Sequence, residues 1–275
     1  MVFSAATPLG AQTAPNAEQI YLKAIEAMRA LPQPASIAYT IDATGSLHPT
    51  CEATKNNDGD IDLDVGRTTQ SKFAVVYYPG GEAARTEDLG THAVCKGFGL
   101  FSPVPDLRPD YDKRQAAKHD AKKADKANKT DKDDDEDWLP GDDGLRYAVQ
   151  DVRPDYSIAV AYAPAIDGHN VYRLVFSPRM RNRAREYPLR EMLVDTETSR
   201  VREIKYDSTF GNFMGDFHLV GDLKLGAAGA YWVVTDFGFS GTGRVMLVQK
   251  TFALTEHAHD FVFLERKQGS SAKGL

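Results

Sequence analysis

Two histidines near the C-terminal end have the residue type and spacing of a metal-binding pair. His257 and His259 are separated by one residue in an extended segment, so both imidazoles lie on one face of a strand. The metal-hydrolase pattern requires an aspartate two residues after the second histidine, where Phe261 stands. No nearby third ligand is evident. We therefore expect two surface histidines and no metal site.

A glycine-rich segment partly resembles the nucleophile elbow of hydrolases. Ser240 lies within Gly238–Gly243, but the elbow requires glycine two residues after the serine, where Thr242 stands. The elbow also requires a strand-to-helix turn, and strand-like segments flank this one on both sides. We expect a glycine-rich hairpin loop, and the sequence predicts neither a catalytic residue nor a cofactor.

An acidic segment resembles a calcium loop. With Gly59 at the sixth position of an EF-hand loop, the first and last ligands are Thr54 and Val65, which do not suit calcium. The aspartates alternate with Ile61 and Leu63, which is typical of the solvent side of a strand. We expect a solvated strand here.

The densest basic cluster outside the charged insertion described below lies between two strand-like segments, within SPRMRNRAREYP. Four arginines alternate there, and such cations bind anionic lipid headgroups or an acidic partner. The alternative is a solvated hairpin. The candidate residues for contact with an anionic surface are Arg179, Arg181, Arg183 and Arg185.

Two cysteines, Cys51 and Cys95, allow one disulfide. In an exported protein they join readily, and a bridge over this loop stabilises the fold by about 3–4 kcal/mol. The alternative is two free buried thiols, because the sequence does not fix the distance between their Cα atoms.

The first residues favour export. Val2–Ala14 is uncharged, small and apolar, and Ala11–Ala14 resembles the cleavage end of a signal peptide without a positively charged front. We interpret residues 1–14 as the remnant of an export signal, the alternative being the disordered N-terminus of a cytoplasmic protein. The expected location is periplasmic or extracellular, in soluble form.

The elements that must position these residues begin with one helix. Residues 16–31 carry apolar side chains at helical spacing, Asn16 is a capping residue and Pro32 ends the helix. The period then changes to two, and short turns between strands indicate an antiparallel meander. The expected strands are 36–44, 60–65, 71–78, 156–162, 171–177, 189–195, 200–207, 216–224, 231–239, 244–254 and 260–264.

A charged segment interrupts this pattern. Residues 113–137 contain eight Lys/Arg and eight Asp/Glu and no large apolar residue, so they cannot bury enough surface to order themselves. We expect one domain, residues 15–267, with a disordered insertion at 108–142 and a disordered tail at 268–275. The insertion is a solvated loop or an arm for a partner. The net charge of −6 argues against a nucleic-acid partner.

Three segments resemble the periplasmic lipoprotein-carrier and outer-membrane lipoprotein-sorting superfamily. They are AEQIYLKAIEAMRALPQPASIAYTIDATGS, VYRLVFSPR with REMLVDTETSRVREIKYD, and YWVVTDFGF through VQKTFAL. The resemblance implies an α+β fold, in which a strongly curved antiparallel sheet, an unclosed barrel, wraps around the N-terminal helix. It also implies acyl chains or apolar peptide surface bound in the concavity. A sheet of about ten strands tends to curl, which agrees with this fold.

The sequence therefore predicts a non-enzymatic carrier or sensor in the cell envelope that binds a lipid, a lipoprotein acyl chain or another apolar ligand. The alternative is a protein-binding envelope module that acts through its surface and charged insertion, with possible peripheral membrane contact. Ligand release would follow movement of the helix or of a lid at 210–217. The candidate ligand contacts are Ile20, Ile25, Tyr39, Ile41, Phe213 and Trp232.

Overall fold

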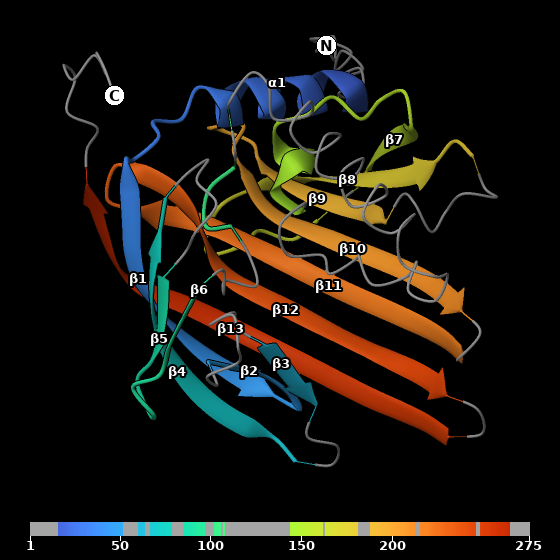
Figure 1. The fold of residues 1–275 in the computed structure, drawn as a ribbon. Coiled ribbons are helices and arrows are strands. Elements are labelled where there is room, and N and C mark those ends of the chain that lie inside the picture. The colour runs from blue at the N-terminus through green and yellow to red at the C-terminus, as the bar shows by residue number, and fades with distance from the viewer. Residues whose placement is uncertain are drawn as a thin grey trace, which may run out of the picture.

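The structure, a computed structural model, contains one α-helix, one short 3-10 helix and a large antiparallel sheet in the part of the chain that it describes (Figure 1). The described residues are 16–51, 60–63, 67–78, 85–96, 102–105, 107, 144–161, 163–180, 188–212, 215–245 and 248–264. The elements are α1 (Ala17–Arg29), β1 (Ser36–Gly45), β2 (Leu47–Thr50), β3 (Asp60–Leu63), β4 (Thr69–Tyr77), β5 (Arg85–Asp88), β6 (Val94–Lys96), η1 (Gly144–Ala148), β7 (Tyr156–Ala161), β8 (Val171–Pro178), β9 (Leu189–Asp195), β10 (Val201–Asn212), β11 (Gly215–Ala228), β12 (Tyr231–Val245) and β13 (Val248–Leu264).

The large sheet has 11 strands in the order β6-β5-β4-β1-β13-β12-β11-β10-β9-β8-β7. Strands β7 to β13 form the predicted meander, and β13 then pairs with β1 in antiparallel register. The sheet bends strongly between β1 and β9 but stays open, with β6 and β7 at its two edges (Figure 1). The predicted α+β fold with an unclosed, curved antiparallel sheet is confirmed.

Helix α1 forms where the sequence predicts it. The Asn16 side chain accepts hydrogen bonds from the backbone N–H groups of Glu18 and Gln19, at 3.0 and 3.3 Å, which caps the first turn. The helix ends at Arg29, before the prolines that cannot continue it. Its buried side chains lie on one stripe and are Ile20, Tyr21, Ala24, Ile25 and Met28.

The helix rests on the chain segment around η1, which lies between α1 and the strands (Figure 1). The Tyr21 hydroxyl donates to the carbonyl of Gln150 at 2.7 Å, and the Arg29 Nε donates to the carbonyl of Val149 at 2.6 Å. Burial raises the pKa of the Tyr21 hydroxyl above its ordinary value. These bonds fix the helix over one end of the sheet.

The contact of η1 with the sheet depends on a glycine. The Tyr206 hydroxyl on β10 donates to the carbonyl of Gly144 at 2.7 Å. A Cβ at Gly144 would lie 2.6 Å from Leu223 Cδ1 and 2.8 Å from the Tyr206 hydroxyl, so a side chain does not fit without movement. Nothing in the sequence analysis indicated η1 or this close approach.

Two predictions about strand boundaries were wrong. Gly238–Gly243 is not a hairpin loop but lies inside β12, and the residues from 248 to 264 form one strand, β13. The glycines admit neighbouring side chains: a Cβ at Gly241 would lie 2.6 Å from Leu219 Cδ2, and one at Gly238 would lie 2.5 Å from Asp222 Oδ1. The glycines here allow close packing of side chains across the sheet. A glycine-rich segment that serves packing looks the same in the local sequence as one that forms a turn.

The strand predicted at 60–65 corresponds to β3. Residues 60–63 form β3 and pair with β2 in a separate two-stranded sheet, while β1 pairs with β4 and β13. The segments predicted to be an export-signal remnant (1–14), a disordered insertion (108–142) and a disordered tail (268–275) lie outside the described residues.

Candidate functional site

The inner face of the sheet is the face that carries η1 and α1, and most of its side chains are apolar. Residues that are directly paired across antiparallel strands point to the same side. One such line of paired residues, the inner row, takes one residue from each strand between β7 and β4. Its members are Val160, Leu174, Met192, Ile204, Leu223, Phe237, Glu256, Ala43 and Ser71.

Glu256 is the ionisable residue of the inner row. Its side chain is 2% exposed and lies directly opposite Phe237 on β12 and Ala43 on β1. Among the residues that the structure describes, neither carboxyl oxygen has a hydrogen-bond partner. Burial raises the pKa of this carboxyl to about 8, because the charged form is poorly solvated there. A protonated carboxyl in this place can both donate and accept a hydrogen bond.

Sequence reasoning missed Glu256, although a signal was present. The period-two pattern of β13 places Leu254, Glu256 and Ala258 on one side, and all three are buried. A glutamate at an inward position of a strand, between two apolar residues on the same face, is the sequence signal that could have identified Glu256.

Four of the predicted ligand contacts come from α1 and β1. Ile20 and Ile25 lie on the buried stripe of α1, and Tyr39 and Ile41 lie on β1; all four belong to one large core cluster. The Tyr39 ring stacks on Phe261 of β13, with ring centroids 5.7 Å apart. Their role as ligand contacts stays a prediction.

The two other predicted ligand contacts have different outcomes. Trp232 is buried, its indole N–H donates to the carbonyl of Val201 at 2.8 Å, and the guanidinium groups of Arg200 and Arg202 lie 5.2 and 5.4 Å from its ring. These contacts fix the ring at the start of β10. Phe213 lies outside the described residues.

The predicted histidine pair lies on the outer face, which is polar. The rings of His257 and His259 stack with centroids 5.7 Å apart, as their spacing predicts. Each is held by carboxylates: His257 Nδ1 lies 2.9 Å from Asp236, and the two nitrogens of His259 lie 3.0 Å from Asp42 and 2.8 Å from Asp260. In the described part of the chain, no group of three or more His, Cys, Asp and Glu side chains is arranged to hold a metal ion.

The outer face also has a hollow of about 610 Å³ where β11, β12 and β13 run past the end of β1. Its lining mixes hydroxyl side chains, including Ser240, Thr242 and Thr251, with the apolar Val220 and Phe252. Arg67 and His218 also line it.

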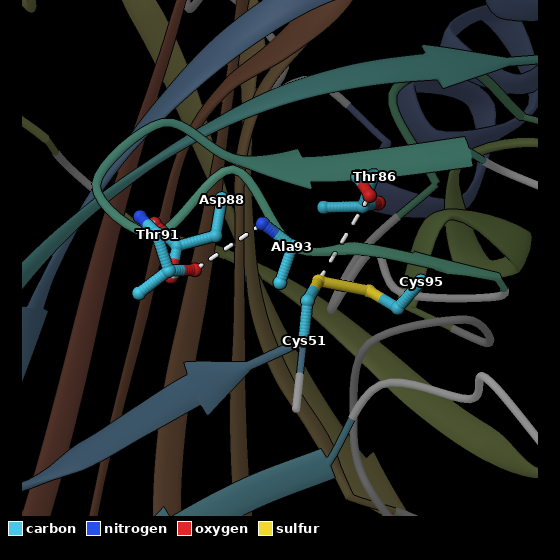
Figure 2. Close-up of a disulfide and its surroundings, with 6 residues drawn as sticks. All are labelled: Cys51, Thr86, Asp88, Thr91, Ala93 and Cys95. Carbon is cyan, nitrogen blue, oxygen red and sulfur yellow. Dashed lines mark hydrogen bonds between the residues drawn. A yellow bond between two sulfur atoms is a disulfide. The ribbon is translucent and has the colours of Figure 1, made fainter. Parts of the chain in front are cut away.

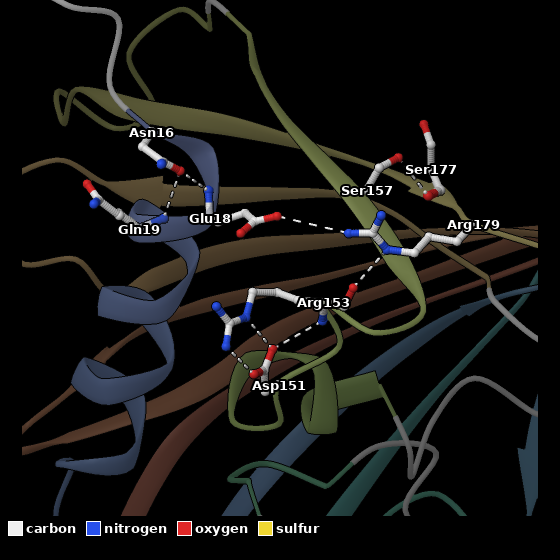
Figure 3. Close-up of polar contacts among 8 residues, drawn as sticks. All are labelled: Asn16, Glu18, Gln19, Asp151, Arg153, Ser157, Ser177 and Arg179. Atoms are coloured by element: carbon white, nitrogen blue, oxygen red, sulfur yellow. Dashed lines mark hydrogen bonds and ion pairs between the residues drawn. The ribbon is translucent and has the colours of Figure 1, made fainter.

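One member of the predicted basic cluster is described. The Arg179 Nε donates to the carbonyl of Arg153 at 3.0 Å, and its Nη2 lies 4.0 Å from Glu18 at the start of α1 (Figure 3). This arginine therefore links the end of β8 to the helix. The other three members, Arg181, Arg183 and Arg185, lie outside the described residues.

The two cysteines form a disulfide in the structure. Cys51 follows β2, Cys95 lies in β6, and their Cα atoms are 5.1 Å apart (Figure 2). Next to the bridge, the turn between β5 and β6 is closed by Thr91, whose hydroxyl donates to Asp88 at 2.9 Å and accepts from the backbone N–H of Ala93 at 3.3 Å. The bridge ties the small sheet to one edge of the large sheet.

Comparison with known proteins finds similarity among solved structures. No protein-family profile matches the chain, and no curated protein matches it in sequence. A LolA superfamily protein from Nitrosomonas europaea has 10% identity and a TM-score of 0.33, over 92% of this chain and 95% of that one. An outer membrane lipoprotein-sorting protein domain from Vibrio parahaemolyticus has 12% identity and a TM-score of 0.34, over 92% and 94%.

A third solved structure, a complex of MucB with MucA(peri), has 8% identity and a TM-score of 0.22, over 91% of this chain and 100% of that one. No helix among the described residues is long and apolar enough to cross a membrane. The fold class follows from the strand order and helix of this chain.

Proposed function

We propose that the protein is a non-enzymatic carrier or sensor of the cell envelope, which binds a lipid, a lipoprotein acyl chain or another apolar ligand against the inner face of the sheet. The observation that carries the proposal is the inner row, which crosses strands β7 to β4 with apolar side chains, the carboxyl of Glu256 and, at its end on β4, the hydroxyl of Ser71. Burial of an alkyl chain on such a surface contributes about 25 cal/mol per Å².

The position of α1 supports the same proposal. The helix lies over one end of the sheet, and the far halves of β10 to β13 extend away from it (Figure 1). The inner side chains of those halves, such as Leu219, Phe239 and Leu254, are buried and belong to the same core cluster as the helix. The apolar surface of the inner face therefore extends well beyond the part that one helix of 13 residues spans.

The disulfide supports a location in the envelope. Bridges such as Cys51–Cys95 form and persist in oxidising compartments and are rare in the cytosol. A periplasmic carrier fits this chemistry, with the Arg179–Arg185 segment as the proposed contact to an anionic membrane surface.

Native mass spectrometry of the protein purified from its own host tests the proposal. A co-purified mass in the lipid range, lost on denaturation, is the expected result. A clean apo mass together with a tightly bound protein partner would contradict the carrier and favour the protein-binding module. Deletion of residues 113–137 separates the two further, since it should leave lipid binding intact and abolish docking through the insertion.

A further inference from the structure

The sheet buries two carboxylates in opposite ways. Asp195 on β9 has a side chain that is 1% exposed, and its oxygens accept from the backbone N–H groups of Glu197 and Thr198 and from the Arg202 guanidinium, at 2.8–3.0 Å. Glu256 is equally buried, and among the described residues none donates a hydrogen bond or a positive charge to it. Buried carboxyls are normally satisfied in this way, and Glu256 has no such donor among the residues that the structure describes.

The surroundings define which donor fits. Glu256 lies in the inner row between Phe237 and Ala43, with Leu254 and Ala258 beside it on the same face of β13. A purely apolar ligand would leave the carboxyl unsatisfied. An ammonium group supplies N–H donors and the opposite charge together, so the buried pair becomes neutral and hydrogen-bonded.

We propose that Glu256 is the polar anchor of the ligand site and that the ligand is an alkyl amphiphile with a primary amine. This inference rests on the proposed function, because it specifies the chemical class of the ligand that the inner face binds. The alkyl chain lies along the inner side chains next to Glu256, such as Phe239 and Leu254, and the amine donates to the Glu256 carboxylate.

Access to the anchor requires an exchange of apolar contacts. Glu256 is shielded from water in this structure, so a ligand that reaches it replaces the groups that now cover it. For the alkyl chain this exchange is nearly balanced, because one apolar contact replaces another. The amine then adds the charge-assisted hydrogen bond that the carboxyl lacks, and this bond makes amines bind more tightly than other alkyl ligands.

Three probes of equal chain length test the inference: decylamine, decanol and decanoate. Each is titrated calorimetrically, near pH 8, into the full chain, into Glu256→Gln and into Glu203→Gln. Glu203 is a matched control, since it is partly buried on the outer face of β10, 3.7 Å from Lys205. The wild type should bind decylamine roughly 10-fold or more tightly than decanol, from one charge-assisted hydrogen bond, and decanoate most weakly.

Glu256→Gln should bring decylamine and decanol to similar affinity while decanol binding stays unchanged, and Glu203→Gln should keep the preference. Circular dichroism verifies that both variants fold. Equal binding of decylamine and decanol by the wild type, or a preference that survives in Glu256→Gln, overturns the anchor and leaves the carrier proposal intact. If none of the three probes binds, the carrier proposal itself fails, and the anchor with it.

Discussion

Replacement of Glu256 by glutamine should change how the stability of the protein depends on pH. The carboxyl has a pKa of about 8 in the folded chain, against an ordinary value of 4.5. Below pH 4.5 the group is protonated in both states and contributes no electrostatic cost. As the pH rises from 4.5 to 8, the unfolded state ionises while the folded state holds its proton, so stability falls. Glutamine does not titrate and removes this fall.

The size of the effect follows from the two pKa values. Their difference, 8 minus 4.5, is 3.5, and each pKa unit corresponds to about 1.4 kcal/mol, so the full loss above pH 8 is about 5 kcal/mol. At pH 7 about 3 kcal/mol of that loss is already present. Glutamine leaves a buried amide without partners, which costs about 1–3 kcal/mol at every pH. The variant should therefore be no more stable than the wild type at pH 5 and clearly more stable at pH 9.

Urea unfolding at pH 5, 7 and 9 measures this difference, with Glu197→Gln at the exposed turn after β9 as the control. The free energy of unfolding of the wild type should fall by several kcal/mol relative to Glu256→Gln between pH 5 and pH 9. The control should run parallel to the wild type. If the curves of Glu256→Gln and the wild type are parallel as well, the carboxyl is not buried unpaired, and the basis of the amine anchor is lost.

Three further predictions concern other parts of the chain. Replacing Cys51 and Cys95 together by serine should lower the free energy of unfolding by about 4 kcal/mol, since the bridge closes a sequence separation of 44. Mild reduction of the wild type should cause the same loss, and an unchanged free energy of unfolding in the double variant would contradict the prediction. Asp195→Asn should cost about 2 kcal/mol near neutral pH, because hydrogen bonds outweigh burial and hold the pKa of Asp195 at about 2. That contribution is present above pH 4 and is lost as the pH falls through 2, so acid unfolding curves of wild type and variant should converge. Arg181→Ala with Arg183→Ala should weaken co-sedimentation with anionic liposomes roughly 30-fold at low salt, at about 1 kcal/mol per arginine, and unchanged co-sedimentation would refute a membrane role for this loop.

Local patterns predicted the elements whose period is unbroken. The helix at 16–31 and the strands at 36–44, 171–177 and 189–195 agree with α1, β1, β8 and β9 to within about two residues, because caps, prolines and period-two alternation act over short distances. The antiparallel meander followed from the short connections between consecutive strands. These features do not depend on the rest of the fold.

Features set by contacts across the sheet could not be predicted in this way. The glycines of 238–243 lie inside a strand, where Leu219 and Asp222 of the preceding strand β11 approach them, and this approach depends on the register between β11 and β12. The strand at 60–63 found its partner in β2, since β1 was already paired on both sides. Strand propensity alone does not show that both edges of β1 are already paired with other strands.

The candidate site was predicted in outline but not in its chemistry. Apolar residues at inward positions, such as Ile25 and Ile41, were correctly placed in the core by their spacing. To predict the inner row, the register of every strand against its neighbours must be known, and no single segment of sequence contains that information. Glu256 stood in a visible alternation, but its isolation from donors depends on residues from β12 and β1 that only the fold brings together.

The position of β1 has a consequence for how the chain folds. Its partner β13 is formed by the last described residues, so Ile37 and Phe263 pair across almost the whole length of the chain. Until synthesis reaches residue 264, the early strands lack one neighbour and the meander lacks its link to them. Such distant pairing slows folding, because a loop of almost the whole chain must close before these contacts form, and the apolar face of the early strands stays exposed during that time.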